Sequence, residues 1–124
     1  MEALDYSRFV LERFDRPPNA GRLLGRVVRG SAGEAAHGTR VEFDFRLRAG
    51  QVEDARFRAY GCPHAIAAAS WVAESAAGRS LTETSWMDPM ELAAMMELPD
   101  HKLGVLLVVE DALRDASGHA GPAD

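Results

Sequence analysis

The sequence predicts an α+β fold: an N-terminal helix, a three-stranded antiparallel sheet and a C-terminal group of helices packed on the sheet. Two observations carry this prediction. Apolar and polar side chains alternate in residues 41–48 and again in 52–59, and Ala49-Gly50 between these runs is typical of a hairpin turn. Alanines then dominate residues 65–77, and this composition favours a helix.

The elements before the hairpin show shorter patterns. Apolar residues recur at helical spacing ahead of the helix-breaking pair Pro17-Pro18, with Asp5 as the expected cap; they are Tyr6, Phe9, Val10 and Phe14. Residues 23–30 are a weaker strand candidate. A loop of small residues is expected at 31–38, and it contains Glu34 and His37.

Three helices are expected after the hairpin. The first begins at Pro63, because proline suits the first helical position, and it ends at Gly78. Asp88 is the expected cap of the second helix, which extends from Pro89 to Met96.

The last apolar run, 105–109, is compatible with a buried strand or with a helix. Apolar and charged residues at helical intervals favour a helix from about Lys102 to Ala116. Residues 118–124 include two glycines and a proline and are expected to form a flexible tail. Residues 1–117 are long enough for a single domain with one core.

Composition argues against several classes of function. With 19 acidic and 14 basic residues, a formal charge of −5 and no basic cluster, the chain lacks the electrostatic signature of nucleic-acid binding. No stretch reaches the roughly 20 apolar residues of a membrane span, and the start lacks a secretory signal pattern, so a cytoplasmic protein is expected. Paired carboxylates, a Ser-His-Asp series and a phosphate-binding glycine loop are not recognisable, so we do not expect an enzyme.

The only cysteine, Cys62, lies where the second strand of the hairpin ends and the alanine-rich helix begins. Unpaired backbone N–H groups and the dipole at a helix N-terminus favour the thiolate, which is the form that binds metal or accepts sulfur. Gly61 permits a close backbone approach, and Pro63 leaves the first helical turn intact. The alternative is that Cys62 is a small, half-buried apolar residue without chemistry.

Four polar residues are candidates to assist Cys62: Glu34, His64, His101 and Lys102. His64 follows two residues after Cys62, so on a regular helix the two side chains point about 200° apart. Histidines at helix ends are more often solvated or capping residues than ligands. Lys102 is either a solvated charge or a group that steadies an anionic sulfur species, and Glu34 is most simply a polar loop residue.

Three separated blocks of sequence point to one family. The first contains Tyr6-Ser7, Phe14 and Pro18-Asn19-Ala20-Gly21, the second is 52–66, and the third contains Leu98-Pro99-Asp100-His101-Lys102-Leu103 and Glu110-Asp111-Ala112-Leu113. With these blocks in this order, nearly the whole chain resembles the NifU N-terminal-like, or IscU-type, iron–sulfur cluster assembly scaffolds. The resemblance implies a scaffold that holds a nascent cluster, or zinc, with three cysteines and a nearby Asp or His. It also implies a cysteine desulfurase as the partner that supplies the sulfur.

Only one of the three cysteines of the family carries over, as Cys62. The Cys-Gly-Asp motif of the family aligns with Ala32-Gly33-Glu34, and its Lys-Leu-His-Cys segment aligns with Lys102-Leu103-Gly104-Val105. The acid of the first motif is therefore kept at Glu34, while His101 lies near the position of the lost histidine. The Leu-Pro-Pro-Val-Lys stretch that a dedicated Hsp70 chaperone recognises in the family is replaced by residues 98–102, which argues against that interaction.

The resulting expectation is a scaffold-like protein that binds iron, sulfur or an iron–sulfur cluster weakly through Cys62. Glu34, His64 and His101 are its candidate additional metal ligands, Lys102 is an accessory group, and zinc is a possible metal. Sharing of the site across a homodimer is one way to supply more thiolates. Two alternatives are an interaction protein without metal that docks on a cysteine desulfurase or a chaperone, and an acceptor of persulfide sulfur.

Overall fold

A computed structural model describes residues 6–120 and contains a three-stranded antiparallel sheet in the order β1-β2-β3. The strands are β1 (Val28–Glu34), β2 (Thr39–Arg48) and β3 (Gln51–Tyr60). The α-helices are α1 (Arg8–Phe14), α2 (Pro63–Ser75), α3 (Pro89–Met96) and α4 (Leu103–His119), and two short 3-10 helices are η2 (Ala35–His37) and η3 (Asp100–Lys102). The predicted α+β fold is confirmed.

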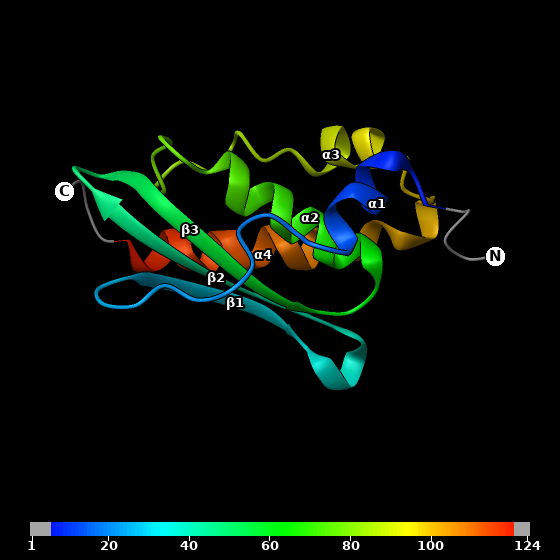
Figure 1. Ribbon diagram of the computed structural model, residues 1–124, viewed down its shortest axis with the longest axis horizontal. Helices are drawn as coiled ribbons and strands as arrows, with labels where there is room; N and C mark the ends of the chain where they lie inside the picture. The colour runs from blue at the N-terminus through cyan, green and yellow to red at the C-terminus, as the bar shows by residue number, and fades with distance from the viewer. Residues whose placement is uncertain (1–5, 121–124) are drawn as a thin grey trace.

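The two long helices cover the same face of the sheet (Figure 1). α2 packs on β3, and α4 packs on β1 and β2. The strands turn Phe43, Phe45 and Phe57 into this interface, where they are buried. Buried alanines of α2 belong to the same core, and their small side chains allow the helix to pack closely against its neighbours; they include Ala67, Ala68, Ala69 and Ala73. α1 and α3 complete the helical layer, with α1 packed against α2 and α3 against α4.

The β2–β3 hairpin has the predicted turn. Ala49 and Gly50 both have positive φ angles, 54° and 79°, and Arg48 pairs with Gln51. Positive φ at both turn residues matches the twist of a two-residue hairpin connection. One irregularity in pairing lies between Arg46 and Leu47. The hairpin prediction is confirmed.

The first strand has different boundaries from those predicted. β1 extends from Val28 to Glu34, so residues 31–34 of the predicted loop belong to the strand. Leu23, which was expected to begin the strand, is instead buried on the other side of the sheet, where its backbone N–H donates to Asp44 at 3.1 Å. The small residues at 30–33 suggest a loop by composition, but Gly30 here admits α4, because a Cβ atom on Gly30 would overlap the backbone of Ala112 and Ala116.

The helix boundaries follow the prediction with local corrections. α1 begins at Arg8, with the Ser7 hydroxyl accepting a hydrogen bond from the Val10 N–H at 3.3 Å, while the predicted cap Asp5 lies outside the described residues. α2 ends at Ser75, before Gly78. The predicted helix 89–96 and its Asp88 cap are confirmed, because an Asp88 carboxylate oxygen accepts from the Met90 N–H at 2.9 Å.

The last helix is longer than predicted. α4 reaches His119, so residues 118 and 119 are helical and the expectation of a flexible tail is wrong for them. A hydrogen bond joins the end of this helix to β1, since His119 Nδ1 lies 2.9 Å from the backbone carbonyl oxygen of Arg29. Residues 121–124 lie outside the described part of the chain.

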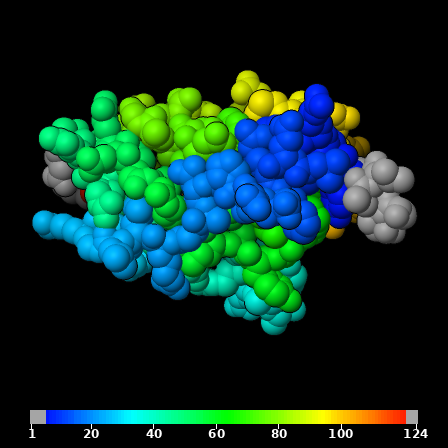
Figure 2. Space-filling model, in the orientation of Figure 1, coloured from blue at the N-terminus to red at the C-terminus, as the bar shows by residue number. Residues whose placement is uncertain are grey.

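A crossing segment, residues 19–25, covers part of the sheet face opposite the helices (Figures 1 and 2). At the free edge of β3 it bonds to Phe57 through the Asn19 carbonyl and the Gly21 N–H, both at 2.9 Å. It then passes over β2, where Asp44 accepts from Leu23 N–H and Arg46 donates to the Leu24 carbonyl. The sheet is therefore covered on both faces, by helices on one and by this segment on part of the other.

Candidate functional site

The junction Gly61-Cys62-Pro63 lies at the end of the sheet where β1 and β2 are connected. Gly61 has a φ of 151°, and a Cβ atom there would lie 3.2 Å from the Gly38 carbonyl oxygen and 3.5 Å from Thr39 Oγ1. Glycine at this position therefore lets the β1–β2 connection pack directly against the chain entering α2. The register brings Glu34 to the same end, because Glu34 pairs with Thr39.

Cys62 is the N-cap residue of α2. Its φ and ψ are −77° and 170°, Pro63 occupies the first helical turn, and the Cys62 carbonyl accepts from the N–H groups of Ala65 and Ile66. The thiol itself makes no capping hydrogen bond and is half-buried. The sulfur is thus not committed to holding the helix.

His64 is buried beside the cysteine in sequence, with 4% of its surface exposed. Its ring meets the ring of Tyr6 edge-on, with centroids 4.9 Å apart. Burial lowers the pKa of His64, and the nearby charges of Lys102 and His101 lower it further. The imidazole is therefore neutral at neutral pH, and its Nδ1 atom is buried with no hydrogen-bond partner among the described residues. A neutral imidazole is the form that ligates metals.

The other candidates lie at the same end of the molecule with more exposure. His101 and Lys102 form the end of η3, immediately before α4, and His101 is exposed while Lys102 is half-buried. α2 packs against α4, and the charges of Lys102 and His101 at the start of α4 contribute to the lowered pKa of His64. Glu34 is exposed at the end of β1, where its carboxylate lies 3.6 Å from His37 Nδ1. The prediction that a histidine at a helix end is solvated fits His101, which is exposed, and is wrong for His64, which is buried.

The candidate ligands do not form a complete metal site within one chain. Between residues 6 and 120, no group of three or more His, Cys, Asp and Glu side chains is close enough to hold a metal ion. The zinc expectation therefore gains no support. Cys62 and His64 lie two residues apart at the start of α2, and the charges of His101 and Lys102 act on His64, but the structure does not gather these residues with Glu34 into one ligand set.

The sequence did not indicate Tyr6 as a member of this site. Its spacing predicts an apolar position in the N-terminal helix, yet it precedes α1 and covers His64. The contact joins residues far apart in the chain, so no local sequence pattern predicts it.

Among the helices of the described part, none combines the length and apolar character needed to cross a membrane.

Comparison with known proteins identifies the family to which this fold and sequence belong. The family model for the NifU-like N terminal domain matches residues 5–119. The iron–sulfur cluster assembly scaffold protein IscU of Escherichia coli K12 is 34% identical over 115 residues, which cover 90% of each chain. IscU of Azotobacter vinelandii is 32% identical over 115 residues, and IscU of Plasmodium falciparum is 29% identical over 118 residues, covering 90% of this chain and 71% of the relative.

Solved structures share the fold. FiSufU from Fervidobacterium islandicum AW-1, of the SUF system, superposes with a TM-score of 0.71 at 12% identity, covering 98% of this chain and 100% of its own. A NifU-like N-terminal structure from Brucella abortus gives a TM-score of 0.51 at 18% identity, covering 92% of this chain and 81% of its own. The resemblance inferred from the residues is confirmed: the chain belongs to the NifU-like N-terminal domain family.

Proposed function

We propose that this protein takes part in iron–sulfur cluster assembly as a scaffold-like carrier that binds iron, sulfur or a cluster through Cys62. The observation that carries the proposal is a thiol at a helix N-terminus that makes no capping bond. His64 supports it, because a neutral imidazole nitrogen without a partner among the described residues belongs to the same first turn of α2, two residues after that thiol. The protein acts as a binding partner for its cargo rather than as a catalyst.

A single chain offers fewer ligands than a cluster requires. Clusters usually take four protein ligands, mostly thiolates with histidine as a substitute. Cys62 and His64 supply two at most, with Glu34 and His101 as further candidates at the same end. We therefore propose that cargo is held weakly, or that a second copy or a small thiol supplies the missing ligands.

Anaerobic reconstitution tests this proposal. Wild-type protein and Cys62→Ala are incubated with ferrous iron and sulfide, desalted and compared by visible absorption. We expect colour in the wild type and none in the variant. Cys62→Ser is the matched control for folding, because serine is a good N-cap and keeps the helix start while removing the sulfur. No colour in any protein, or equal colour in all three, would exclude cluster binding at Cys62.

A second candidate function follows from the incomplete ligand set: Cys62 accepts sulfur from a cysteine desulfurase. The Cys62 thiolate attacks the outer sulfur of the donor persulfide, a new S–S bond forms on Cys62, and the donor leaves as a thiolate. Mass spectrometry after desulfurase turnover would show a mass increase of one sulfur atom in the wild type that is absent in Cys62→Ala. A wild-type protein without this adduct, in the absence of a reducing thiol and with the persulfide present on the desulfurase itself, would contradict sulfur acceptance.

A further inference from the structure

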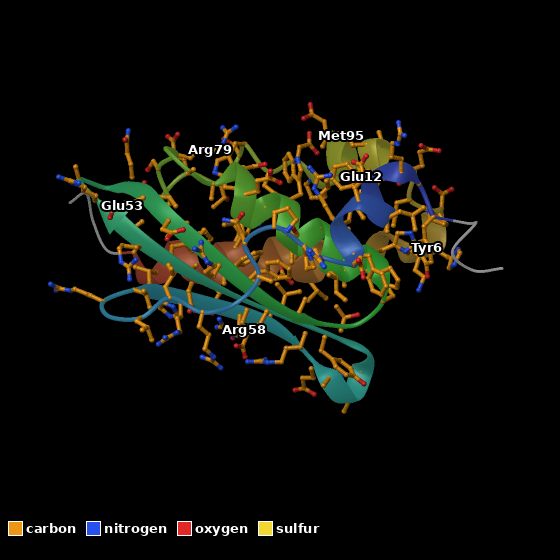
Figure 3. All side chains as sticks on the ribbon, viewed as in Figure 1. Tyr6, Glu12, Glu53, Arg58, Arg79 and Met95 are labelled. Carbon is orange, nitrogen blue, oxygen red and sulfur yellow. The ribbon has the colours of Figure 1, made fainter. Side chains whose placement is uncertain are left out.

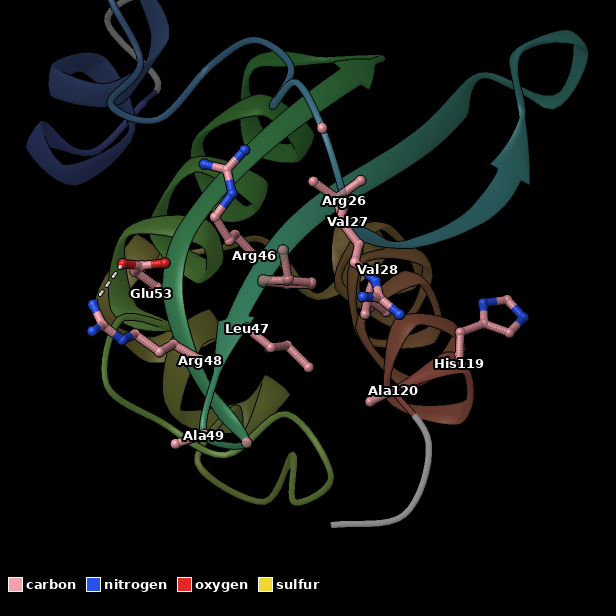
Figure 4. Close-up of a pocket in the computed structure, with 13 residues that line it drawn as sticks. Arg26, Val27, Val28, Arg46, Leu47, Arg48, Ala49, Glu53, His119 and Ala120 are labelled. Atoms are coloured by element: carbon pink, nitrogen blue, oxygen red, sulfur yellow. Dashed lines mark ion pairs between the residues drawn. The ribbon is translucent and has the colours of Figure 1, made fainter. Parts of the chain in front are cut away.

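A cavity of about 770 Å³ lies at the end of the sheet opposite Cys62. Its walls are the tip of the β2–β3 hairpin, residues 25–28 and the C-terminal end of α4 (Figure 4). β3 separates it from the Gly61-Cys62 junction by ten strand residues, which is roughly 30 Å. Figure 3 shows the same separation, with Glu53 of the cavity and Tyr6, the neighbour of His64, at opposite ends of the molecule. A ligand in this cavity therefore does not contact the candidate cluster site.

The cavity carries positive charge in a protein whose formal charge is −5. Three arginines line it, Arg26, Arg46 and Arg48, against one acid, Glu53, which leaves an excess of two positive charges. Arg48 and Glu53 approach to 3.6 Å, but the Arg48 side chain is 81% exposed, so this ion pair is weak. Arg46 donates to the Leu24 carbonyl, and neither it nor Arg26 forms an ion pair with a residue in the range 6–120.

The basic groups do not converge on one point. Figure 4 shows Arg46 and Arg48 on the hairpin side of the cavity, with Arg48 turned toward Glu53, and Arg26 on the other side; Leu47 projects between the two sides. Val28 and Ala120 add apolar surface to the same floor. A single small oxyanion is best held by donors that converge, whereas this arrangement fits two or more carboxylates separated by an apolar side chain.

We propose that this cavity is a docking site for an acidic segment of a partner protein, in which an apolar residue packs beside Leu47, one carboxylate pairs with Arg26, and another pairs at the rim with Arg48, whose exposed side chain exchanges Glu53 for it. The proposal does not depend on cluster binding at Cys62. Because the arginines are solvent-exposed, the binding is modest and is weakened by salt. Arg46 positions the cavity wall, since its guanidinium group also lies against Gly25.

Fluorescence anisotropy with a defined probe tests the docking site. The probe is a fluorescein-labelled peptide, Asp-Glu-Leu-Asp-Glu, and its amide counterpart, Asn-Gln-Leu-Asn-Gln, is the reference. We expect the wild type to bind the acidic peptide and not the amide one, with weaker binding as salt rises. Arg26→Gln and Arg48→Gln should each weaken binding about fivefold, as expected for the loss of one exposed ion pair.

Matched variants make the result decisive. Arg114→Gln removes the same charge from an exposed residue of α4 that does not line the cavity, so its binding should equal that of the wild type. Cys62→Ala should also bind the peptide normally, whatever its effect on reconstitution. Absent binding, equal weakening in Arg26→Gln and Arg114→Gln, or equal affinity for the amide peptide would overturn the proposal. Displacement by equimolar inorganic phosphate would reassign the cavity to small oxyanions.

Discussion

His64 packs under Tyr6 at the start of α2, and its environment there is unlike that of a typical helix-end histidine. Burial removes water from the ring, and the neighbouring charges of Lys102 and His101 oppose a further positive charge. All three effects lower the pKa of His64. In the unfolded chain the imidazole regains its ordinary pKa, about 6.5. The folded and unfolded states therefore bind different numbers of protons below that pH.

This difference predicts that acid destabilises the metal-free protein before carboxylates titrate. Between pH 7.5 and 5.5 the unfolded state takes up a proton that folded His64 does not, so the free energy of unfolding falls as the pH falls. One proton limits the slope to about 1.4 kcal/mol per pH unit. Urea unfolding of chelator-treated protein, followed by circular dichroism at several pH values, measures it.

The matched variants for this measurement are His64→Gln and His37→Gln. The first should flatten the dependence between pH 7.5 and 5.5, because glutamine does not titrate. The second should retain it, because the His37 side chain is 80% exposed at the surface. Curves of the same steepness for wild type and His64→Gln would show that another group is responsible.

At the level of elements, α4 packs very closely on β1. A Cβ atom on Gly30 would overlap backbone atoms of Ala112 and Ala116, so the helix and the strand meet with no side chain between them. Polar groups extend this interface, since the Ser31 N–H donates to the Asp115 carboxylate at 2.9 Å. β1 is an edge strand, and Asp115 and His119 occupy backbone groups on its outer side that would otherwise be unpaired.

Gly30→Ala should therefore be strongly destabilising. The added methyl group meets backbone rather than a flexible side chain, so α4 has to move away from β1, at a cost of about 3 kcal/mol or more. Gly118→Ala is the control, because nothing lies within 4 Å of a Cβ atom there and alanine favours the helix. Chemical denaturation should show a large loss for the first variant and no loss for the second. Similar midpoints for Gly30→Ala and the wild type would contradict this packing.

The same interface explains what the sequence could and could not predict about the elements. The hairpin and the helix after Pro63 have strong local signals, namely strict alternation, a turn dipeptide and a run of alanines, and both are present. β1 has no such signal, because Gly30 is set by the approach of α4, and Gly33 by its positive φ angle and the nearby Thr39 carbonyl, rather than by strand propensity. The pattern around Leu23 reads as a strand but reflects burial in the crossing segment.

The candidate site was predictable in part for the same reason. The position of Cys62 at a helix start follows from local sequence and is confirmed. The burial of His64 depends on Tyr6, which comes from another part of the chain, so the sequence favoured a solvated histidine. Which candidates lie close together depends on the meeting of α2, α4 and the β1–β2 connection, and local patterns carry no information about that meeting.

At the scale of the whole molecule, the crossing segment connects the helical layer to the open face of the sheet. It follows α1 in the chain and pairs with the edge of β3. It then passes over Asp44 in β2 and leads into residues 25–28, which form one wall of the arginine-lined cavity. Asp44 binds the middle of the crossing segment to the sheet. Its carboxylate is fully buried and accepts hydrogen bonds from the Leu23 N–H, Arg29 and Arg58. Figure 3 shows Arg58 on this open face of the sheet.

Asp44 should therefore limit the stability of the fold in acid. Burial alone would raise the pKa of Asp44, but the hydrogen bonds from Arg58 and Leu23 N–H and the charges of Arg58 and Arg29 outweigh it, so the pKa lies below its usual value. A lowered pKa in the folded state adds stability above the ordinary pKa of aspartate, about 3.9, and this contribution is lost as the pH falls through the folded-state value.

Asp44→Asn should cost about 3 kcal/mol at neutral pH, because Arg29 and Arg58 lose the buried charge they share. The variant should also lose less stability than the wild type between pH 5 and pH 3, since its amide does not titrate. Glu53→Gln is the control, because it removes an exposed carboxylate whose ion pair with Arg48 is weak, and it should stay within about 0.5 kcal/mol of the wild type. Urea unfolding at each pH measures both effects. Equal costs for the two variants at neutral pH would mean that the crossing segment is not held to the sheet through Asp44.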